Sequence, residues 1–247
     1  MLRFLGFALL LAIALAVLAP AALLAPQVGT LSGGALTLHD AEGTVWNGRG
    51  TLAVQGQRLP VAWRVEPAAV VGGELAVRVT APDGPRATPR VRLAARRDGF
   101  VLADADFALP AAALLRDPAA RATLALDGTL GVRIAMLERR GNGYHGAAEL
   151  TWTGARLRFA PGSPALDLGS VSVALQGTGD RLEGPLSNRG GAVALGGAAG
   201  IDASGTPTLD VLVTPRAPLD PALTNLLRAA GHAEGDGWRL RWPARGQ

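Results

Sequence analysis

One glycine-rich segment has the spacing of a cofactor-binding motif. Residues 141–146 read Gly-Asn-Gly-Tyr-His-Gly and so match G-x-G-x-x-G. That motif binds a dinucleotide when a helix begins at its last glycine and faces the pyrophosphate. Here residues 147–152 continue as a predicted strand, and Asn-Gly is a favoured dipeptide of tight hairpins. We therefore interpret the segment as a hairpin turn and predict no cofactor there.

The acidic and histidine residues give no catalytic or metal-binding pattern. Asp104 and Asp106 share one face of a predicted strand, where two carboxylates could hold a cation or act as acid and base. No third ligand lies near them in the sequence, which favours a solvated strand face. His39, His145 and His232 are far apart, and we interpret them as surface residues. The chain has no cysteine and no G-x-S-x-G elbow. We predict no catalytic, cofactor-binding or metal-binding residues and no enzymatic activity.

Arginine is the charged residue type that clusters most strongly in the sequence. All 24 basic residues are arginine, and against 20 acidic residues they leave a net charge of +4. This balance, and the lack of aromatic stacking platforms beside the arginines, argues against a nucleic-acid partner. The cluster is either a basic patch for an acidic protein or phospholipid head groups, or a solvated outer face. Its members are Arg78, Arg86, Arg90, Arg92, Arg96 and Arg97.

The elements that must position these residues are predicted to be antiparallel strands. The 33 glycines and 17 prolines exclude long helical bundles. Apolar residues instead alternate with polar ones, which is typical of strands with one buried face. The clearest examples are Val61, Trp63 and Val65; Leu75, Val77 and Val79; Val171, Val173 and Leu175; and Trp238, Leu240 and Trp242. Tight turns are indicated by Asn47-Gly48, Asp83-Gly84, Asp98-Gly99, Asp127-Gly128 and Asn142-Gly143. Two short helices are expected at residues 110–117 and 218–230, each opened by proline.

The amino-terminal region predicts a membrane anchor. Residues 4–25 carry no charge and follow Arg3. A helix of that length spans roughly 33 Å, enough to cross the membrane once, and the positive-inside tendency places the amino terminus in the cytoplasm. We expect an anchor at residues 1–26 and a periplasmic β-rich domain at residues 27–247. The alternative is a signal peptide cleaved near Ala19-Pro20-Ala21.

The periplasmic part contains a candidate internal duplication. Trp46 in GTVWNG recurs as Trp152 in ELTWTG, and the helix-opening Pro110 recurs as Pro218. Leu59 and Leu75 recur, in the same order, as Leu168 and Leu186. We predict two homologous halves, residues 35–140 and 141–247, with the tryptophans buried at equivalent places. The alternative is chance recurrence of W-x-G in a glycine-rich β protein.

These landmarks resemble one known family in their order and spacing. They are GTVWNG (43–48), RLPVAWRVEP (58–67) with the following GGEL, ALPAAALL (108–115), ELTWTGARL (149–157), LDLGSV (166–171) and LLRAAGH (226–232). With the apolar amino-terminal segment, they make the chain similar to the type II secretion system protein N family. The resemblance implies a single-pass inner-membrane accessory subunit of the machine that exports folded proteins from the periplasm. It carries over no catalytic or cofactor residues.

Three functional classes follow. The leading hypothesis is a non-enzymatic assembly subunit that binds the secretin or another inner-membrane secretion component through sheet edges or the arginine face. The alternative is an anchored lipid-binding or lipid-bridge protein with an apolar β groove. The five tryptophans are large enough to fill an interior, which favours the first class. An enzyme is the third class, and the missing nucleophiles and metal ligands argue against it. No small-molecule substrate is expected.

Overall fold

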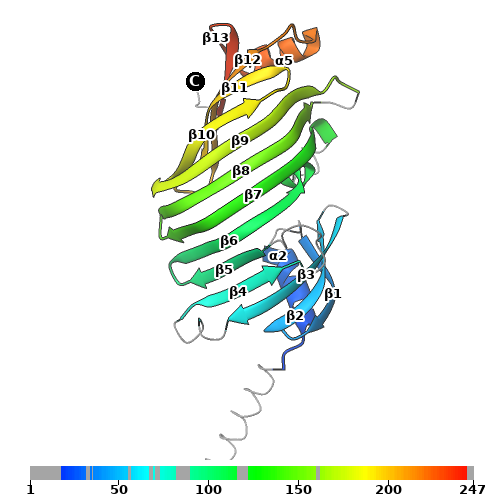
Figure 1. Cartoon of the computed structure of the whole chain (residues 1–247), viewed down its shortest axis with the longest axis vertical. Coiled ribbons are helices and arrows are strands. Elements are labelled where there is room, and N and C mark those ends of the chain that lie inside the picture. The colour runs from blue at the N-terminus through cyan, green and yellow to red at the C-terminus, as the bar shows by residue number, and fades with distance from the viewer. Residues whose placement is uncertain are drawn as a thin grey trace, which may run out of the picture. The chain divides into compact units, whose positions relative to one another are not determined.

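The fold is mainly β and antiparallel, as predicted (Figure 1). The computed structural model describes residues 18–31, 34, 36–54, 57–66, 69, 73–81, 90–115, 122–159 and 162–243. These residues form 14 strands. The chain divides into two compact units, unit 1 (Met1–Arg97) and unit 2 (Asp98–Gln247).

Unit 1 is an antiparallel meander in which each strand pairs with the next. The strands are β1 (Leu36–Gly43), β2 (Asn47–Val54), β3 (Gln57–Glu66), β4 (Leu75–Thr80) and β5 (Arg90–Arg96). The predicted alternation holds in β3, where Trp63 and Val65 are buried and Arg64 is exposed. Leu75 departs from it, because the side chain at this first position of β4 is 51% exposed.

Two helical elements cover part of the apolar face of unit 1, where the sequence predicted a membrane-spanning helix up to residue 25 and no helix beyond it. They are the 3-10 turn η1 (Ala21–Leu23) and the helix α2 (Leu24–Leu31). Ala21 packs with Leu38 and Trp63 in one buried cluster, and Ala25 and Val28 contact that cluster from α2. Pro26 and Gly29 give α2 a weak intrinsic helix preference, so tertiary packing must stabilise it.

The start of the described chain is therefore part of unit 1. Pro20 forms a β-bridge with Thr44, and the boundary expected at residue 26 falls inside α2. Most of the predicted anchor, residues 1–17, lies outside the described residues. Among the residues that are described, no helix has the length and apolar character needed to cross a membrane.

Unit 2 contains the longest strands of the chain. Its strands follow the order β6 to β12 and then β14 and β13. Their bounds are β6 (Gly99–Pro110), β7 (Ala125–Arg140), β8 (Gly143–Arg158), β9 (Leu166–Gly179), β10 (Leu182–Arg189), β11 (Val193–Ile201), β12 (Pro207–Pro215), β13 (His232–Glu234) and β14 (Gly237–Trp242). Every pair is antiparallel, and β14 returns to pair with β12 after a helix.

That helix, α5 (Pro221–Ala230), confirms the predicted carboxyl-terminal helix. It begins three residues later than expected, because the Asp220 carboxylate caps it by accepting a hydrogen bond from the Ala222 amide at 2.8 Å. Leu223 and Leu227 bury the helix against the sheet. The other expected helix, at residues 110–117, is only the 3-10 turn η2 (Ala111–Leu114). Its last two expected residues lie outside the described part.

The dipeptides that predicted tight turns lie in two different structures, a hairpin turn and a β-bulge. Asn142-Gly143 lies in the β7–β8 hairpin, as predicted. The prediction of a turn at Asp127-Gly128 is wrong, because these residues lie inside β7 at a register shift. Gly128 has φ +103°, and a Cβ there would lie 2.5 Å from the Gly154 carbonyl oxygen. A positive φ therefore makes a bulge here and not a turn.

The duplication stays a prediction. In sequence order, β2 to β6, η2 and β7 correspond to β8 to β12, α5 and the final β14, with β13 as an extra element. Trp46 and Trp152 are both half-buried and not fully buried, and they lie differently: Trp46 precedes β2, whereas Trp152 lies inside β8. The compact units divide after Arg97, whereas the expected repeat boundary falls in the β7–β8 hairpin.

Candidate functional site

The residues first considered for catalysis do not converge. The segment 141–146 forms the β7–β8 hairpin, and no helix follows it. Asp104 and Asp106 are exposed, and Asp106 lies 3.9 Å from Arg133. The three histidines are exposed on separate elements. Within the described residues, no group of three His, Cys, Asp or Glu side chains is placed to hold a metal ion.

The arginine cluster forms one defined surface on unit 1, here called the arginine surface. Strand register places Arg64, Arg78 and Arg92 directly opposite one another across β3, β4 and β5. Like charges placed opposite one another in a sheet repel and are destabilising. The surface also contains Arg96 and two carboxylates, Glu66 and Glu74. Of the other predicted members, Arg97 is exposed beyond β5, whereas Arg86 and the Arg90 side chain lie outside the described part.

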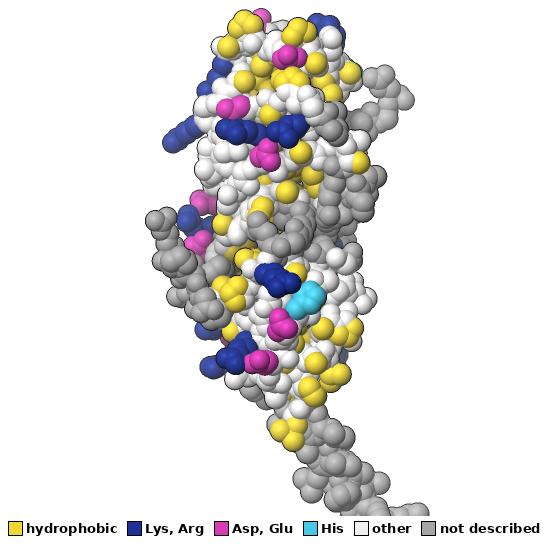
Figure 2. Space-filling view, turned by 90° about the vertical axis from the view of Figure 1, so that its right-hand side faces the viewer, with side chains coloured by type: hydrophobic (Ala, Val, Ile, Leu, Met, Phe, Trp, Pro, Cys, Tyr) yellow, Lys and Arg dark blue, Asp and Glu magenta, His cyan; other side chains and the backbone are white. Residues whose placement is uncertain are grey.

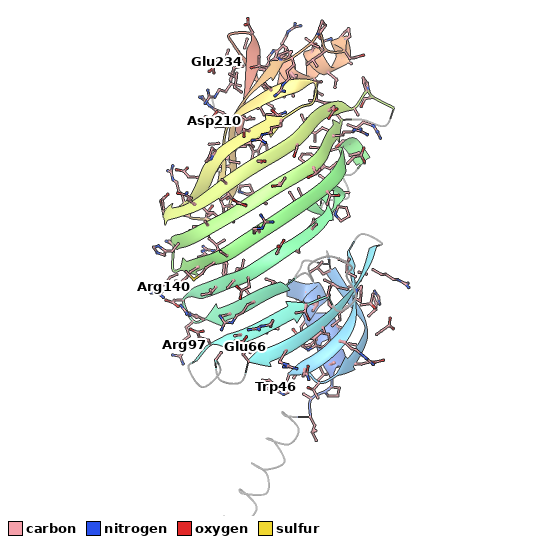
Figure 3. The ribbon with its side chains drawn as sticks, viewed as in Figure 1. Trp46, Glu66, Arg97, Arg140, Asp210 and Glu234 are labelled. Carbon is pink, nitrogen blue, oxygen red and sulfur yellow. The ribbon has the colours of Figure 1, made fainter. Side chains whose placement is uncertain are left out.

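Glu66, whose position is labelled in Figure 3, relieves this repulsion by pairing with two of the opposed arginines. One carboxylate oxygen accepts a hydrogen bond from Arg78 Nη2 at 2.9 Å, and the other accepts one from Arg92 Nε at 3.0 Å. The hydrogen bond from Arg92 is the main reason that the pKa of Glu66 is lowered, and burial opposes it only in part. Glu66 is therefore ionised and shared between β4 and β5.

The arginine surface keeps an excess of positive charge. Arg96 Nε donates to Glu74 at 2.6 Å, so the two glutamates are already engaged with three of the four arginines. Arg64 is exposed, and no carboxylate in the described part of the chain forms an ion pair with it. Arg64 is thus the arginine best placed to meet an acidic group from outside. The basic patch for an acidic partner stays a prediction, and three of the four arginines of this surface pair with its own carboxylates.

We expect the Glu66 pair to make stability depend on pH. The pKa of Glu66 is lower in the folded chain than its usual value of 4.5, so its contribution is complete above that value and is lost as the pH falls through the folded pKa. Glu66→Gln should therefore cost unit 1 about 1 kcal/mol at neutral pH and flatten the stability loss between about pH 5 and pH 3. Urea unfolding at a series of pH values measures both effects.

The matched control is Glu183→Gln, which changes an exposed glutamate of unit 2. An identical pH profile for Glu66→Gln and the unsubstituted chain would contradict the pairing.

A second charged network joins the last strands of unit 2. Asp210 on β12 accepts hydrogen bonds from Arg239 and from Arg241, both on β14. Arg239 also donates to Glu234 of β13 at 3.1 Å. The hydrogen bond from Arg239 lowers the pKa of Asp210, and the same bond raises the pKa of Arg239. The network fixes the positions of β12, β13 and β14.

The outer edge of β14 is partly open beside this network. The three-residue β13 pairs only with the first part of β14, up to Arg239. In the part of the chain that the structure describes, residues 240–242 therefore have a neighbouring strand on the β12 side only. Trp242 is 62% exposed, although its alternation with Leu240 predicted a buried position. By contrast, the edge strand β1 carries a register shift after His39, which protects a sheet edge against pairing.

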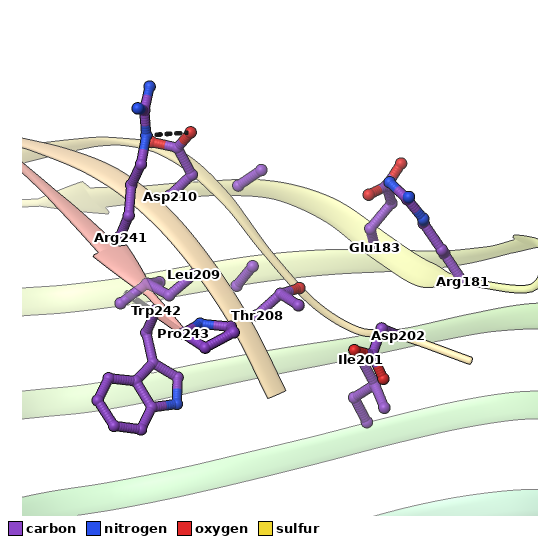
Figure 4. A pocket seen from close by; sticks show the side chains of 12 residues that line it. Arg181, Glu183, Ile201, Asp202, Thr208, Leu209, Asp210, Arg241, Trp242 and Pro243 are labelled. Carbon is purple, nitrogen blue, oxygen red and sulfur yellow. Dashed lines mark hydrogen bonds and ion pairs between the residues drawn. The ribbon is translucent and has the colours of Figure 1, made fainter. Parts of the chain in front are cut away.

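A pocket of about 390 Å³ lies next to Trp242 in unit 2 (Figure 4). Ile201 and Leu209 contribute apolar side chains, and Arg241 and Asp210 pair with each other at its rim. Asp202, also in the lining, accepts a hydrogen bond from the Ser204 hydroxyl, which lowers its pKa. Arg241, Asp210 and Asp202 therefore already have partners within the protein.

The sequence indicated the arginine surface but not the open edge, which depends on where β13 ends. It also did not indicate the pocket, whose lining comes from β10, β11, β12, β14 and the residues next to them. A family model described as "Type II secretion system (T2SS), protein N" matches residues 34–241. Searches of the curated proteins and of the solved structures give no match.

Proposed function

Because the chain belongs to the type II secretion system protein N family, we propose that it is a non-enzymatic accessory subunit of that system, held in the inner membrane with its bulk in the periplasm. Membership supports a role in the export of folded proteins. The charge pattern supports the topology, since Arg3 precedes the uncharged segment and the next charged residue is Asp40. The partners proposed are the secretin or a neighbouring inner-membrane secretion component.

The observation that carries the binding role is the open edge of β14. A strand whose outer backbone groups lack a neighbour can accept an extended segment from a partner, and main-chain hydrogen bonds then supply affinity. The exposed Trp242 side chain adds a large apolar contact at the same edge. The arginine surface contributes a second, electrostatic contact through Arg64.

The packing of unit 2 favours this role over the lipid-groove alternative. At one end, the sheet face is filled by α5 and by the partly buried Trp152 and Trp238. Farther along the sheet, Ile134 and Leu175 are also buried. Side chains occupy the space that acyl chains would need, and the described pocket is lined partly by charged residues.

Photocrosslinking in cells tests the proposal. A photoreactive residue at position 242 should capture a secretion subunit, because Trp242 is 62% exposed and lies on the open edge. The controls are positions 172 and 176, which are exposed on β9 between two paired strands and should capture none. Arg64→Glu should weaken capture more at low salt than at high salt, since screening acts within about 10 Å. Capture of phospholipid at positions 201 and 209, with none of protein at the edge, would favour the lipid-binding alternative.

A further inference from the structure

We infer that unit 1 lies directly on the bilayer surface, through an interfacial rim made of Leu18, Leu23 and Trp46. The inference rests on the proposed membrane anchor and adds where the folded part meets the lipid. Its partner is the apolar boundary region of the membrane, and no protein is needed to cover the rim.

The two leucines of the rim are exposed, whereas Ala21, which lies between them in the sequence, is buried. The Leu18 side chain is 70% exposed and that of Leu23 is 57% exposed, whereas Ala21 between them is 1% exposed. Ala21 faces Trp63 and Leu38, so the turn that buries it directs the two leucines elsewhere. Hydrophobic side chains gather on the lower part of the face drawn in Figure 2, at the end where the described chain begins.

Backbone hydrogen bonds hold the turn that carries Trp46 against Ala19 and Pro20, the residues that follow Leu18. The Val45 amide donates to the Ala19 carbonyl at 2.9 Å, and Thr44 bridges to Pro20. The turn that carries Trp46 is therefore fixed at the point where the chain enters unit 1 (Figure 3). Tryptophan is the side chain that membrane proteins favour at the boundary between lipid and water, because its ring is apolar and its N–H is polar.

The length of the apolar segment requires this close approach. Residues 4–18, from the residue after Arg3 to the first described residue, span about 22 Å as a helix, whereas the hydrocarbon core is about 30 Å thick. The following residues cannot extend such a helix without leaving the sheet, because Pro20 forms a β-bridge with Thr44 and Ala21 is buried in unit 1. The shortfall of about 8 Å is the depth to which an interfacial segment enters a membrane.

Two of the charges near the rim pair with each other, and a third, Arg64, which strand register places opposite Asn47, does not. Glu42 and Arg49 lie on β1 and β2 close to the Trp46 turn, and Arg49 Nη2 lies 2.6 Å from the Glu42 carboxylate. They neutralise each other. In the sequence, no charged residue occurs from residue 4 to residue 39.

Fluorescence in lipid vesicles tests the position of Trp46. The full chain is placed in vesicles of phosphatidylethanolamine and phosphatidylglycerol, with or without bromine on the acyl chains. Bromine should quench part of the fluorescence of the five tryptophans. Trp46→Phe should abolish that quenching. The control, Trp152→Phe, removes an indole that donates a hydrogen bond to the Asp127 carbonyl in unit 2, and it should leave the quenching unchanged. Quenching that survives Trp46→Phe overturns the inference.

A cysteine pair gives a second readout that needs no tryptophan change. The chain has no cysteine, so single replacements can be labelled cleanly. Leu23→Cys and Leu75→Cys replace leucines of similar exposure, 57% and 51%, in the same unit. A charged maleimide should label the first about tenfold more slowly in vesicles, because only that site lies in lipid. Leu18→Cys serves if Leu23→Cys fails to fold.

Carbonate washing separates the two ways in which the inference can fail. Release of the protein from the vesicles contradicts the anchor, and with it the proposed inner-membrane role. If the protein is retained but positions 23 and 75 are labelled at equal rates, the anchor is supported and the inference that the rim lies in lipid is wrong.

Discussion

Trp63→Ala should destabilise unit 1 by about 3–5 kcal/mol, because it empties the centre of the contact between the sheet and α2. The Trp63 side chain is 7% exposed and packs against Ala21 and Leu38. Its Nε1 donates to the Thr44 carbonyl at 3.3 Å, so the substitution also removes a hydrogen bond. Urea unfolding of unit 1 measures the loss, and limited proteolysis within residues 21–31 should become faster as α2 loosens.

The control is Trp242→Ala, which removes a tryptophan that is 62% exposed and should cost less than about 1 kcal/mol. Equal losses for the two variants would contradict the assigned core.

The exposure of Trp46 and Trp152 revises the prediction that both are fully buried. Both are half-buried, so their replacement should cost less than that of Trp63.

Asn188→Leu should destabilise unit 2 by roughly 3 kcal/mol while nearly conserving side-chain volume. The Asn188 amide nitrogen donates to the carbonyls of Leu168 at 2.6 Å and Val193 at 2.9 Å. Its carbonyl oxygen accepts a hydrogen bond from the Leu195 amide at 2.8 Å. One side chain thus connects β9, β10 and β11. The amide nitrogen also donates to the Gly190 carbonyl at 3.2 Å, so leucine would leave three carbonyls and one amide without this partner, in a region where Val193 is fully buried.

Asn225→Ala is the matched control for this substitution. Asn225 lies exposed on α5, and its side-chain oxygen accepts a single hydrogen bond, from Arg228 at 3.3 Å. Its loss should change the free energy of unfolding by less than about 0.5 kcal/mol. If Asn188→Leu also changes the free energy of unfolding by less than about 0.5 kcal/mol, the prediction is wrong, and water replaces the lost hydrogen bonds.

The strands were predictable because their signal is local. Alternation in Val61, Trp63 and Val65 needs only one buried face, and the structure buries Trp63 and Val65. Helix α2 was missed for the opposite reason. Its sequence includes Pro26 and Gly29, and its stabilising contacts come from strands later in the chain. A distant apolar face therefore overrides the local preference.

The candidate site was predictable in composition but not in arrangement. The sequence located the arginines, yet only strand register places Arg78 and Arg92 opposite each other with Glu66 between them. The open edge of β14 depends on the length of β13, which is three residues and leaves no periodic pattern. At Asp127-Gly128 the dipeptide predicted a turn, but pairing with β8 places the positive φ of Gly128 in a bulge inside β7.

The order of the strands has a consequence for how the chain reaches its folded state. Each strand of unit 1 pairs with the strand next to it in the sequence, and the same holds in unit 2 from β6 to β12. The exception is β14, which pairs with β12 across the intervening α5. Contact order is therefore low for a β protein, and loop-closure entropy stays small at each step. A chain that emerges amino end first, from a ribosome or a membrane channel, can add each strand to the preceding one as soon as it appears. Throughout its synthesis the growing sheet then exposes one fresh edge at a time, which limits aggregation until β14 arrives.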